Sequence, residues 1–267
     1  MSKASQKKSK PLVSIIMNCH NGEKFLRQSI KSIKNQTYSN WELIFWDNKS
    51  TDHSKKIIKT YSDKRIKYFK SKNFLNLYNA RNLAIKKAKG KYISFLDVDD
   101  LWKKNKLKKQ VSYLKKNKDF KIVYSNFTTI DNLKNKKYVY YKNLLPCGNI
   151  TQKLLNNYQV GILTVMLEKK LFNDQKFNNS YNIIGDFDFF LNLSTKYKFG
   201  CIQEYLAYYR IHGENYSKIK HEIYIKEIKN WISRNQKKMD KLSFTINPVK
   251  RMLTKLKIKY ILKFLGA

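Results

Sequence analysis

The sequence predicts an α/β fold with a mainly parallel central sheet and helices on both faces. Short apolar, β-branched segments such as residues 12–18 and 91–96 have the composition of buried strands. Longer stretches between such segments, including residues 22–36 and 77–90, carry apolar side chains at helical spacing. Strands that alternate with helices of about three turns are typical of parallel sheets, whose right-handed crossovers place helices on both faces.

The first half of the chain is expected to contain five strands separated by four helices. Ser50 or Thr51 is suited to cap the second helix, and Gly90 is suited to end the third. The strands are predicted at residues 12–18, 41–46, 65–70, 91–96 and 121–126, and the helices at residues 22–36, 53–61, 77–90 and 103–117.

The alternation becomes less regular after the fifth predicted strand. A further strand is predicted at residues 162–167, a helix at residues 186–197 and a late strand within residues 200–212. Beyond about residue 215 the chain is strongly basic, with a helical pattern. We therefore divide the chain into a basic N-terminal segment at residues 1–10, one α/β domain at residues 11–215 and a basic helical extension at residues 216–267.

Basic residues are in large excess. The 267 residues include 56 Lys and Arg against 19 Asp and Glu, which gives a formal net charge of +37. Such a charge attracts nucleic acid, anionic lipid surfaces or phosphorylated substrates, and a biased genome composition would produce it equally well. Because 42% of the residues are hydrophobic, the chain can form a sizeable core, which argues against wholesale disorder.

The cysteines and the terminal segment predict a cytoplasmic protein. Cys19, Cys147 and Cys201 are far apart and form no CxxC pair, which argues for reduced thiols and against a zinc site or a disulfide framework. Residues 1–10 are basic but have no apolar region of the kind found in signal peptides. No apolar run approaches the roughly 18 residues of a membrane span, so we expect no crossing of a bilayer.

Acidic residues are scarce, yet three of them follow one predicted strand within four residues. Asp97, Asp99 and Asp100 come directly after the fourth predicted strand, and Asp47 follows the second. The carboxyl ends of parallel strands form the ligand-binding edge of an open sheet, so these side chains should share one rim. A divalent cation, Mg²⁺ or Mn²⁺, would offset the repulsion between neighbouring carboxylates. In the plain structural alternative, Asp100 caps the next helix while Asp97 and Asp99 lie in a solvated turn.

Five motifs, in order along the chain, resemble those of family 2 glycosyltransferases. They are "VSIIMNCHNGEKFL", "QTYSNWELIFWDNKSTD", "NARN", "AKGKYISFLDVDD" and "YYRIH". Each motif alone is weak, but their order and spacing over about residues 12 to 215 make the resemblance specific. By this resemblance the chain is identified as a member of the family, which implies the GT-A fold, a single α/β domain that binds a nucleotide-sugar.

The resemblance implies a donor-binding role for four residues. Asn18 and His20, at the end of the first strand, would border the nucleotide. Asp47 would accept a hydrogen bond from the base, with uracil as a suitable partner, and Arg81 would approach the base or the diphosphate. The usual Pro of the family is Asn18 here and the usual aromatic residue is His20, which we interpret as variation in the nucleotide loop.

The resemblance also implies a metal site. Asp97 would meet the ribose or the metal, and Asp99 would ligate the metal. His212 occupies the position of a histidine that reaches the diphosphate or the metal, although a lone histidine often has only a structural role. Mg²⁺ or Mn²⁺ would clamp the diphosphate and neutralise the charge that develops on it as the sugar departs.

The remaining catalytic position is the general base for the acceptor hydroxyl. In the family it is the Asp of a Glu-Asp pair that begins a late helix, and the segment "GDFDFFL" places Asp186 there, with Gly185 in place of the Glu. Asp188 is the competing candidate. Because residues two positions apart lie on different faces of a helix, only one of the two should face the site. A single displacement assisted by Asp186 would invert the anomeric centre.

Three other classes of function compete with a glycosyltransferase. A nucleic-acid-binding protein would explain the charge, but the sequence has no recognition motif for nucleic acid, and an acidic rim repels phosphates unless a metal is bound. A glycosidase also uses two carboxylates, but it needs neither a metal clamp nor a residue that reads a base. An inactive binding module would not need to keep Asp97, Asp99 and Asp186. We therefore expect an inverting, metal-dependent glycosyltransferase that uses a nucleotide-sugar donor and a glycan or lipid-linked acceptor, with bacterial surface polysaccharide as the setting.

The C-terminal segment predicts a basic amphipathic helix over residues 248–267. One side carries Val249, Met252, Leu253, Leu256, Tyr260 and Phe264, which Ile258, Ile261, Leu262 and Leu265 would widen, and another side carries Arg251, Lys255, Lys259 and Lys263. Such a helix can lie in the interface of an anionic membrane, where a lipid-linked acceptor is found. The alternative is a helix that packs back on the catalytic domain.

Overall fold

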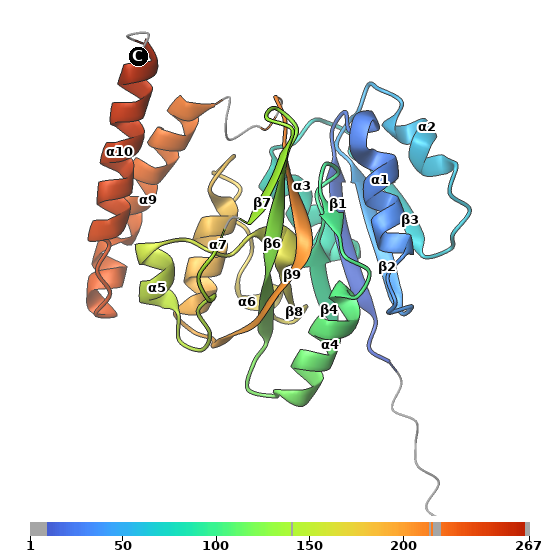
Figure 1. Ribbon diagram of the computed structural model, residues 1–267, viewed down its shortest axis with the longest axis horizontal. Coiled ribbons are helices and arrows are strands. Elements are labelled where there is room, and N and C mark those ends of the chain that lie inside the picture. Colours follow the sequence, from blue (N-terminus) through green and yellow to red (C-terminus); the bar gives the residue numbers. More distant parts are fainter. Residues whose placement is uncertain (1–9, 140, 214, 216–219, 265–267) are drawn as a thin grey trace, which may run out of the picture.

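The computed structural model describes residues 10–139, 141–213, 215 and 220–264, and a single mixed sheet lies at its centre (Figure 1). Its strands are β1 (Val13–Cys19), β2 (Trp41–Asp47), β3 (Ile66–Lys70), β4 (Tyr92–Phe95), β5 (Leu101–Trp102), β6 (Ile122–Asp131), β7 (Lys136–Val139), β8 (Met166–Glu168) and β9 (Phe199–Ile211). Their order in the sheet is β3-β2-β1-β4-β8-β6-β9-β5, with β7 paired to β6.

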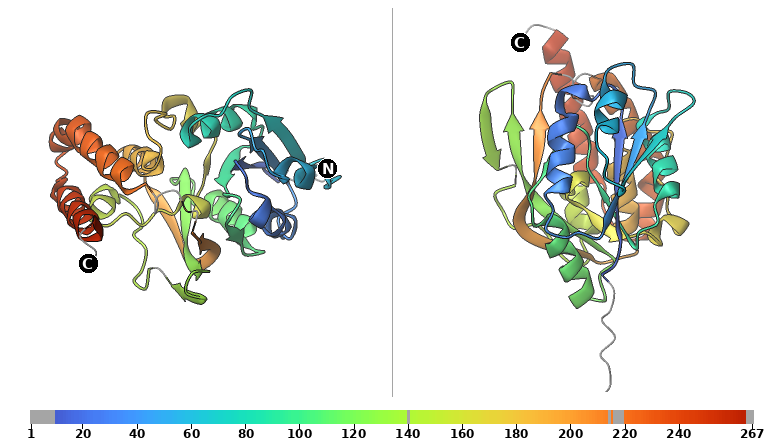
Figure 2. Two further views of the ribbon diagram at one scale, coloured as in Figure 1. Left: turned by 90° about the horizontal axis from the view of Figure 1, so that it is seen from above. Right: turned by 90° about the vertical axis from the view of Figure 1, so that its right-hand side faces the viewer.

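Helices cover both faces of this sheet, as the two further views in Figure 2 show. They are α1 (Glu23–Lys34), α2 (Ser54–Lys59), α3 (Leu77–Lys87), α4 (Lys106–Lys116), α5 (Thr151–Asn156), the 3₁₀ turn η1 (Ile162–Thr164), α6 (Leu171–Asp174), α7 (Gly185–Ser194), α9 (His221–Lys241) and α10 (Asn247–Phe264). The α/β fold predicted from the sequence is therefore confirmed.

The N-terminal half of the sheet is parallel and the C-terminal half is mixed. β3, β2, β1 and β4 pair in parallel, with Cys19 of β1 opposite Asp47 of β2. β8 then runs antiparallel to both β4 and β6, whereas β6 and β9 pair in parallel. Because β1, β2 and β4 point the same way, their carboxyl ends meet at one edge of the sheet, where a ligand can bind.

Alternate side chains of the central strands enter two separate hydrophobic clusters. Ile15 and Met17 of β1 pack into a cluster with α1, α2 and α4, whereas Ile16, between them, packs into a cluster with α3, α7 and α9. All seven residues of β1 are buried. Burial on both faces explains why this strand is a continuous apolar run rather than an alternating one.

Three local predictions differ from the structure. The strand expected at residues 162–167 is reduced to β8, because residues 162–164 form η1, where the Thr164 hydroxyl donates to the Gly161 carbonyl at 2.6 Å. Helix α3 ends at Lys87 rather than at Gly90. Neither Ser50 nor Thr51 caps α2, whose N-cap position is His53.

The two C-terminal helices pack against the α/β body next to α7 (Figures 1 and 2). Ile228, Trp231 and Met239 of α9 are buried in the same cluster as α7, and Val249 of α10 joins them. The hydrophobic core is therefore continuous across the predicted boundary at residue 215. No helix in the described residues is long and apolar enough to span a membrane.

The predicted apolar side of α10 divides into two faces. Val249 is buried and Met252 and Leu253 pack against the core, whereas Ile258, Ile261 and Leu262 are 52%, 55% and 45% exposed. Periodicity alone could not separate these sets, because it does not show which face meets the protein. Leu265, which we expected to widen the apolar face, lies outside the described residues.

Candidate functional site

A cavity of about 530 Å³ opens at the carboxyl ends of β1 and β4. It brings together residues that are up to 197 positions apart, from the ends of β1 and β4, the start of α3, the start of α7 and the segment after β9. Most of the sequence-predicted site residues line it, namely Asn18, His20, Arg81, Asp97, Asp99 and Asp186. Other lining residues include Asn48, Phe74, Tyr78, Asp100 and Asn215.

Asp97 forms an ion pair with Arg81 inside this cavity. Nη2 of Arg81 lies 2.8 Å from Oδ1 of Asp97, and the Arg81 side chain is only 2% exposed. The guanidinium also lies near the faces of Tyr78, Phe95 and Phe177. Burial raises the pKa of the Asp97 carboxyl, and the Arg81 charge opposes this rise. Arg81 is thus a fixed cation on the cavity wall.

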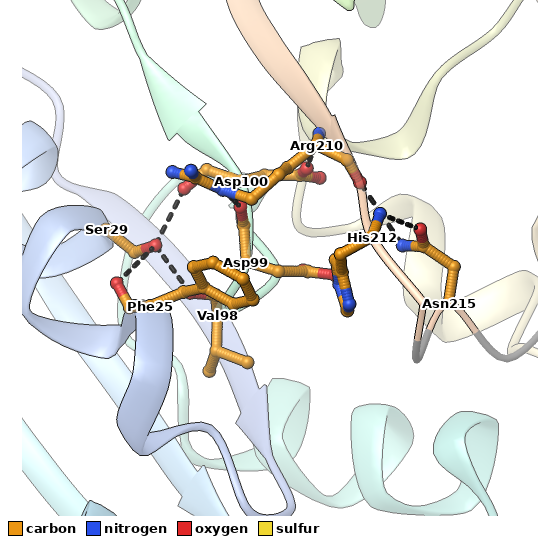
Figure 3. Close-up of polar contacts among 8 residues, drawn as sticks. All are labelled: Phe25, Ser29, Val98, Asp99, Asp100, Arg210, His212 and Asn215. Carbon is orange, nitrogen blue, oxygen red and sulfur yellow. Dashed lines mark hydrogen bonds and ion pairs between the residues drawn. The ribbon is translucent and has the colours of Figure 1, made fainter. Parts of the chain in front are cut away.

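Asp99 pairs with His212, which comes from the segment that follows β9 (Figure 3). The distance between Asp99 Oδ2 and His212 Nε2 is 3.0 Å. The His212 backbone N–H donates to the Asn215 side chain at 2.6 Å, and the His212 ring packs against Phe25. These contacts hold the histidine over the acidic loop, and its reach to the diphosphate or the metal stays a prediction.

The loop that carries the acids is fixed from two sides (Figure 3). From α1, the Ser29 hydroxyl donates to the carbonyls of Val98 and Asp100 at 2.6 and 2.7 Å. From β9, the Arg210 backbone N–H donates to Oδ1 of Asp100 at 2.9 Å, and its Nε donates to the Asp99 carbonyl at 2.8 Å. Burial raises the pKa of Asp100 well above its usual range. Arg210 therefore braces the loop through both its backbone and its side chain, and Asp100 has a structural partner.

The donor set at this loop fits a divalent cation that is completed by a substrate. Asp99 offers a carboxylate oxygen and His212 an imidazole nitrogen, a combination suited to Mn²⁺, while Mg²⁺ commonly takes one or two carboxylates plus phosphate oxygens. Within the described residues, no group of three or more His, Cys, Asp or Glu gathers as a metal site. Asp97 is already paired with Arg81. Asp99 and His212 are accordingly the residues that would hold a metal.

Asp186 and Asp188 face different surroundings at the start of α7. Asp186 lines the cavity, and its Oδ1 accepts from the Phe187 N–H at 2.8 Å. Asp188 is 5% exposed, and its Oδ1 accepts from Trp231 Nε1 at 3.0 Å and from Asn192 Nδ2 at 3.1 Å. Burial raises the pKa of both carboxyls. Only Asp186 of the two lines the cavity, in agreement with the expectation that residues two apart on a helix face different ways.

The glycine before Asp186 makes room for an aromatic ring. A Cβ atom at Gly185 would lie 2.5 Å from two ring carbons of Tyr78, which is too close for any side chain. The Tyr78 hydroxyl donates to the Ile183 carbonyl at 2.7 Å and lies 3.4 Å from Oδ1 of Asp186. Tyr78 therefore occupies the space in which a glutamate side chain at position 185 would begin.

Asn18 and His20 lie on the cavity wall at the end of β1. Asn18 is 8% exposed, and neither its amide nitrogen nor its amide oxygen has a hydrogen-bond partner among the described residues. His20 Nδ1 lies 3.1 Å from the Asn48 carbonyl, and its ring packs edge-on against Phe74, which is 60% exposed. A buried amide without a partner is costly, so Asn18 is suited to bind a polar ligand.

Asp47 does not line the cavity. Its side chain is 0% exposed, Oδ1 accepts from the Ser50 N–H at 2.7 Å and Oδ2 accepts from the Tyr68 hydroxyl at 2.6 Å. In this arrangement the carboxylate fixes the turn after β2. Its predicted role as the reader of the base stays a prediction, and that role would require one of these two hydrogen bonds to be exchanged.

Sequence reasoning missed several residues that shape the cavity. Tyr78 stands directly before the "NARN" motif, and the loop before it supplies Phe74. Glu227 and Trp231, more than 40 residues after Asp186, contact the segment around it. The substitution of Gly185 for the usual Glu was a usable signal for Tyr78, whereas no local pattern pointed to Glu227.

An α/β sheet with an acidic cavity at the carboxyl ends of its parallel strands is typical of the α/β proteins that bind a ligand at this edge. The chain belongs to one family of transferase enzymes within this class, because the model of glycosyl transferase family 2 matches residues 14–181. The family resemblance found in the sequence is thus confirmed, and with it the assignment to a transferase rather than a glycosidase.

Curated relatives with known or inferred roles include two bacterial enzymes. Over 166 residues the chain is 39% identical to the UDP-Glc:alpha-D-GlcNAc-diphosphoundecaprenol beta-1,3-glucosyltransferase WfgD of Escherichia coli, covering 62% of this chain and 64% of that protein. It is 31% identical over 164 residues to the putative teichuronic acid biosynthesis glycosyltransferase TuaG of Bacillus subtilis, covering 60% of this chain and 64% of that protein.

A longer match covers most of the chain. An uncharacterized glycosyltransferase of Rickettsia bellii is 33% identical over 251 residues, which is 92% of this chain but only 36% of that protein. The chain thus spans less than two thirds of the length of the Escherichia coli and Rickettsia relatives.

Solved structures confirm the GT-A fold. S. aureus TarS 1–349 in complex with UDP matches with a TM-score of 0.63 at 19% identity, over 81% of this chain and 65% of that one. The mannosyltransferase PcManGT from Pyrobaculum calidifontis, in complex with GDP-Man and Mn²⁺, matches with a TM-score of 0.64 at 14% identity, over 92% of this chain and 70% of that one.

Proposed function

We propose that the protein is an inverting, metal-dependent glycosyltransferase that moves one sugar from a UDP-sugar to a glycan or lipid-linked acceptor. The observation that carries the proposal is the arrangement around one cavity of Arg81 with Asp97, Asp99 with His212, and Asp186. The names of the relatives from Escherichia coli and Bacillus subtilis support bacterial surface polysaccharide assembly as the setting.

We assign binding of the nucleotide-sugar donor to residues from β1, α3 and the acidic loop. Asn18 and His20 border the nucleotide, and Arg81 offers a fixed positive charge to the diphosphate. Asp99 and His212 would hold Mg²⁺ or Mn²⁺, which offsets the negative charge on the leaving diphosphate. The PcManGT structure, with its Mn²⁺, supports the choice of a divalent ion.

We assign activation of the acceptor hydroxyl to Asp186. Its carboxylate takes the proton of the acceptor hydroxyl while the hydroxyl oxygen bonds to the anomeric carbon. The bond between that carbon and the diphosphate oxygen breaks, and the electron pair leaves with the nucleoside diphosphate. Attack from the face opposite the diphosphate inverts the anomeric centre, and a general base contributes a factor of about 10²–10⁴ to the rate.

A donor screen tests the proposal. The protein would be incubated with Mn²⁺ and a panel of UDP-, GDP- and TDP-sugars, with a polyprenyl-diphosphate sugar as acceptor, and released nucleoside diphosphate would be measured. We expect release with one UDP-sugar, dependent on Asp186 and sensitive to a chelator. If no donor is consumed, or if the product keeps the anomeric configuration of the donor, the proposal is wrong.

We also propose that the outer face of α10 lies on an anionic membrane. Ile258, Ile261 and Leu262 form an exposed stripe on the side opposite the packed residue Val249. Lys255 and Lys259, four residues apart, are exposed on one side of this stripe, and Lys257 is exposed on the other side. Each lysine near an anionic surface adds about 1 kcal/mol to binding. A cytoplasmic enzyme held in this way would work at the inner face of the cytoplasmic membrane, next to a lipid-linked acceptor.

Cosedimentation with vesicles tests this attachment. Wild-type protein should pellet with vesicles that contain phosphatidylglycerol, and the variant with Ile258, Ile261 and Leu262 changed to Ser should stay in solution. Leu133 and Leu144, which lie elsewhere and are 62% and 79% exposed, provide the control when changed to Ser. Deletion of the whole helix is a poorer test, because it removes Val249 from the core. A triple variant that pellets like the wild type would exclude α10 as the membrane face.

A further inference from the structure

A buried carboxylate on α9 accepts hydrogen bonds from three consecutive backbone amides. Glu227 is 5% exposed. Its Oε1 accepts from the Asn182 N–H at 2.6 Å, and its Oε2 accepts from the N–H groups of Ile183 and Ile184 at 2.9 and 3.1 Å. The Asn182 side chain adds a fourth donor at 3.2 Å. Hydrogen bonds to a charged acceptor are stronger than neutral ones, so this segment is firmly held.

The segment held by Glu227 leads directly into α7 and Asp186. Ile184 is the N-cap residue of α7, and its carbonyl accepts from the Asp188 N–H at 2.9 Å. On the opposite side, the Tyr78 hydroxyl of α3 donates to the Ile183 carbonyl at 2.7 Å. Residues 182–184 are thus fixed between α9 and α3, two positions before the carboxylate that faces the cavity.

One turn further along α9, a second residue contacts the same helix beyond Asp186. Trp231 is fully buried, its Nε1 donates to Oδ1 of Asp188 at 3.0 Å, and its ring packs against Phe187. Residues four apart lie on the same face of a helix. Glu227 and Trp231 therefore hold the chain on both sides of Asp186 from a single face of α9.

We infer that Glu227 is a positioning residue for Asp186, acting through residues 182–184. The inference rests on the proposed transferase function. It adds Glu227 as a second carboxylate, one that holds the proposed general base Asp186 in place. A small displacement of a reacting group has a large effect on rate. Removal of the Glu227 charge would leave buried amides unsatisfied and let the segment move.

The first arm of the test compares two variants on the same helix. Glu227→Gln keeps the size of the side chain, but its NH₂ group faces an amide donor. We expect kcat to fall about 10- to 100-fold, because a displacement of a reacting group by about 1 Å can cost about 10²-fold in rate, while affinity for UDP with Mn²⁺ changes less than about twofold. Asp240→Asn, at the far end of α9, should change neither quantity. Equal loss of UDP affinity and kcat would overturn the inference, as would an unchanged kcat.

The second arm separates positioning from a general structural effect. In the Asp186→Asn background, Glu227→Gln should have little further effect on kcat, because residues that act as a unit are not additive. Full additivity would overturn the inference. Glu227→Asp, which keeps the charge but shortens the reach, should lose less kcat than Glu227→Gln. Thermal melting checks that each variant is folded.

The third arm does not depend on activity. Hydrogen exchange of residues 182–184 should be strongly accelerated in Glu227→Gln, while exchange in β1 stays unchanged. If the wild type consumes no donor, the proposed function fails, and the exchange result still decides whether Glu227 fixes this segment. Unchanged exchange at residues 182–184 would overturn the inference even in an active enzyme.

Discussion

Two groups of aspartates lie at the cavity, and the two groups differ in the partners that their carboxylates contact. The loop after β4 carries Asp97, Asp99 and Asp100, and the start of α7 carries Asp186 and Asp188. In each group the carboxylate of one aspartate accepts a hydrogen bond that fixes the structure, and we assign that aspartate no part in the reaction. Asp100 accepts from the Arg210 backbone, and Asp188 accepts from the Trp231 indole.

The difference between the groups lies in the members that face the cavity. Asp97 and Asp99 each have a side chain that is or can be cationic beside them, Arg81 and His212. Asp186 has no such partner within hydrogen-bonding distance among the described residues, only the Phe187 N–H and the Tyr78 hydroxyl. Burial raises the pKa of both Asp97 and Asp186, but within the described part of the chain only Asp97 has a cation, Arg81, within hydrogen-bonding distance, whereas Asp186 has only neutral donors there.

The largest expected effect follows from breaking the first group. Asp99→Ala should abolish transfer, because it removes the carboxylate that would hold the metal with His212. The side chain is 23% exposed, so the fold should remain intact by circular dichroism. Mn²⁺ binding in the presence of UDP, measured by calorimetry, should be lost as well. Full activity of this variant in the presence of a chelator would remove the metal role.

Replacing Asp186 and Asp188 one at a time should show which of them acts as the base. Asp186→Asn is nearly isosteric but cannot accept the proton, so kcat should fall by about 10²-fold or more while donor affinity stays near normal. Asp188→Asn can still accept from Trp231 and should reduce kcat much less. Single-turnover kinetics would measure both. The reverse order of effects would show that Asp188 is the base.

The dependence of kcat on pH should provide a further test of Asp186 as the base. Burial raises the pKa of Asp186 above its usual value of about 3.9. Since the base must be deprotonated, kcat should decline as the pH falls through this raised pKa, well before an ordinary aspartate would protonate. The acid limb should disappear from the residual activity of Asp186→Asn. A limb that persists in that variant would belong to another group.

The smallest expected effect on turnover concerns Asp47. Asp47→Ala leaves the Ser50 N–H and the Tyr68 hydroxyl without their acceptor, which should lower the free energy of unfolding by about 1–3 kcal/mol in urea titrations. If Asp47 also reads the base, affinity for UDP should fall more than affinity for inorganic pyrophosphate. Equal losses for the two ligands would limit Asp47 to fixing the turn.

The parallel half of the sheet was predictable from local sequence, because strands buried on both faces are continuous apolar runs. The expected strands at residues 12–18 and 41–46 became β1 and β2 with shifts of one residue at most. The common direction of the parallel strands also predicted that the aspartates after them would lie at one edge of the sheet. In the mixed half, β6 and β9 were also expected, at residues 121–126 and within residues 200–212. The antiparallel pairing of β8 was not expected, since this strand has three residues and depends on its neighbours rather than on its own pattern.

Prediction of the site was limited by contacts that join distant segments. Asp99 and Asp186, which the motifs singled out, both line the cavity, and His212 contacts Asp99 there, while their roles stay predictions. The motifs could not show that Asp47 has both oxygens engaged, nor that Glu227 reaches the segment before α7. Periodicity likewise identified the apolar residues of α10 without deciding which of them face the core.

The contact between Gly185 and Tyr78 has a consequence for how this sequence can change over evolutionary time. Since any Cβ at position 185 would collide with the Tyr78 ring, the two positions cannot vary independently. A relative with Glu at the position of Gly185 should therefore carry a smaller residue at the position of Tyr78. A lineage that gains the Glu must first shrink the ring, and a lineage that gains the Tyr must first replace the Glu with Gly. The order of mutations near the base is thus constrained by space alone.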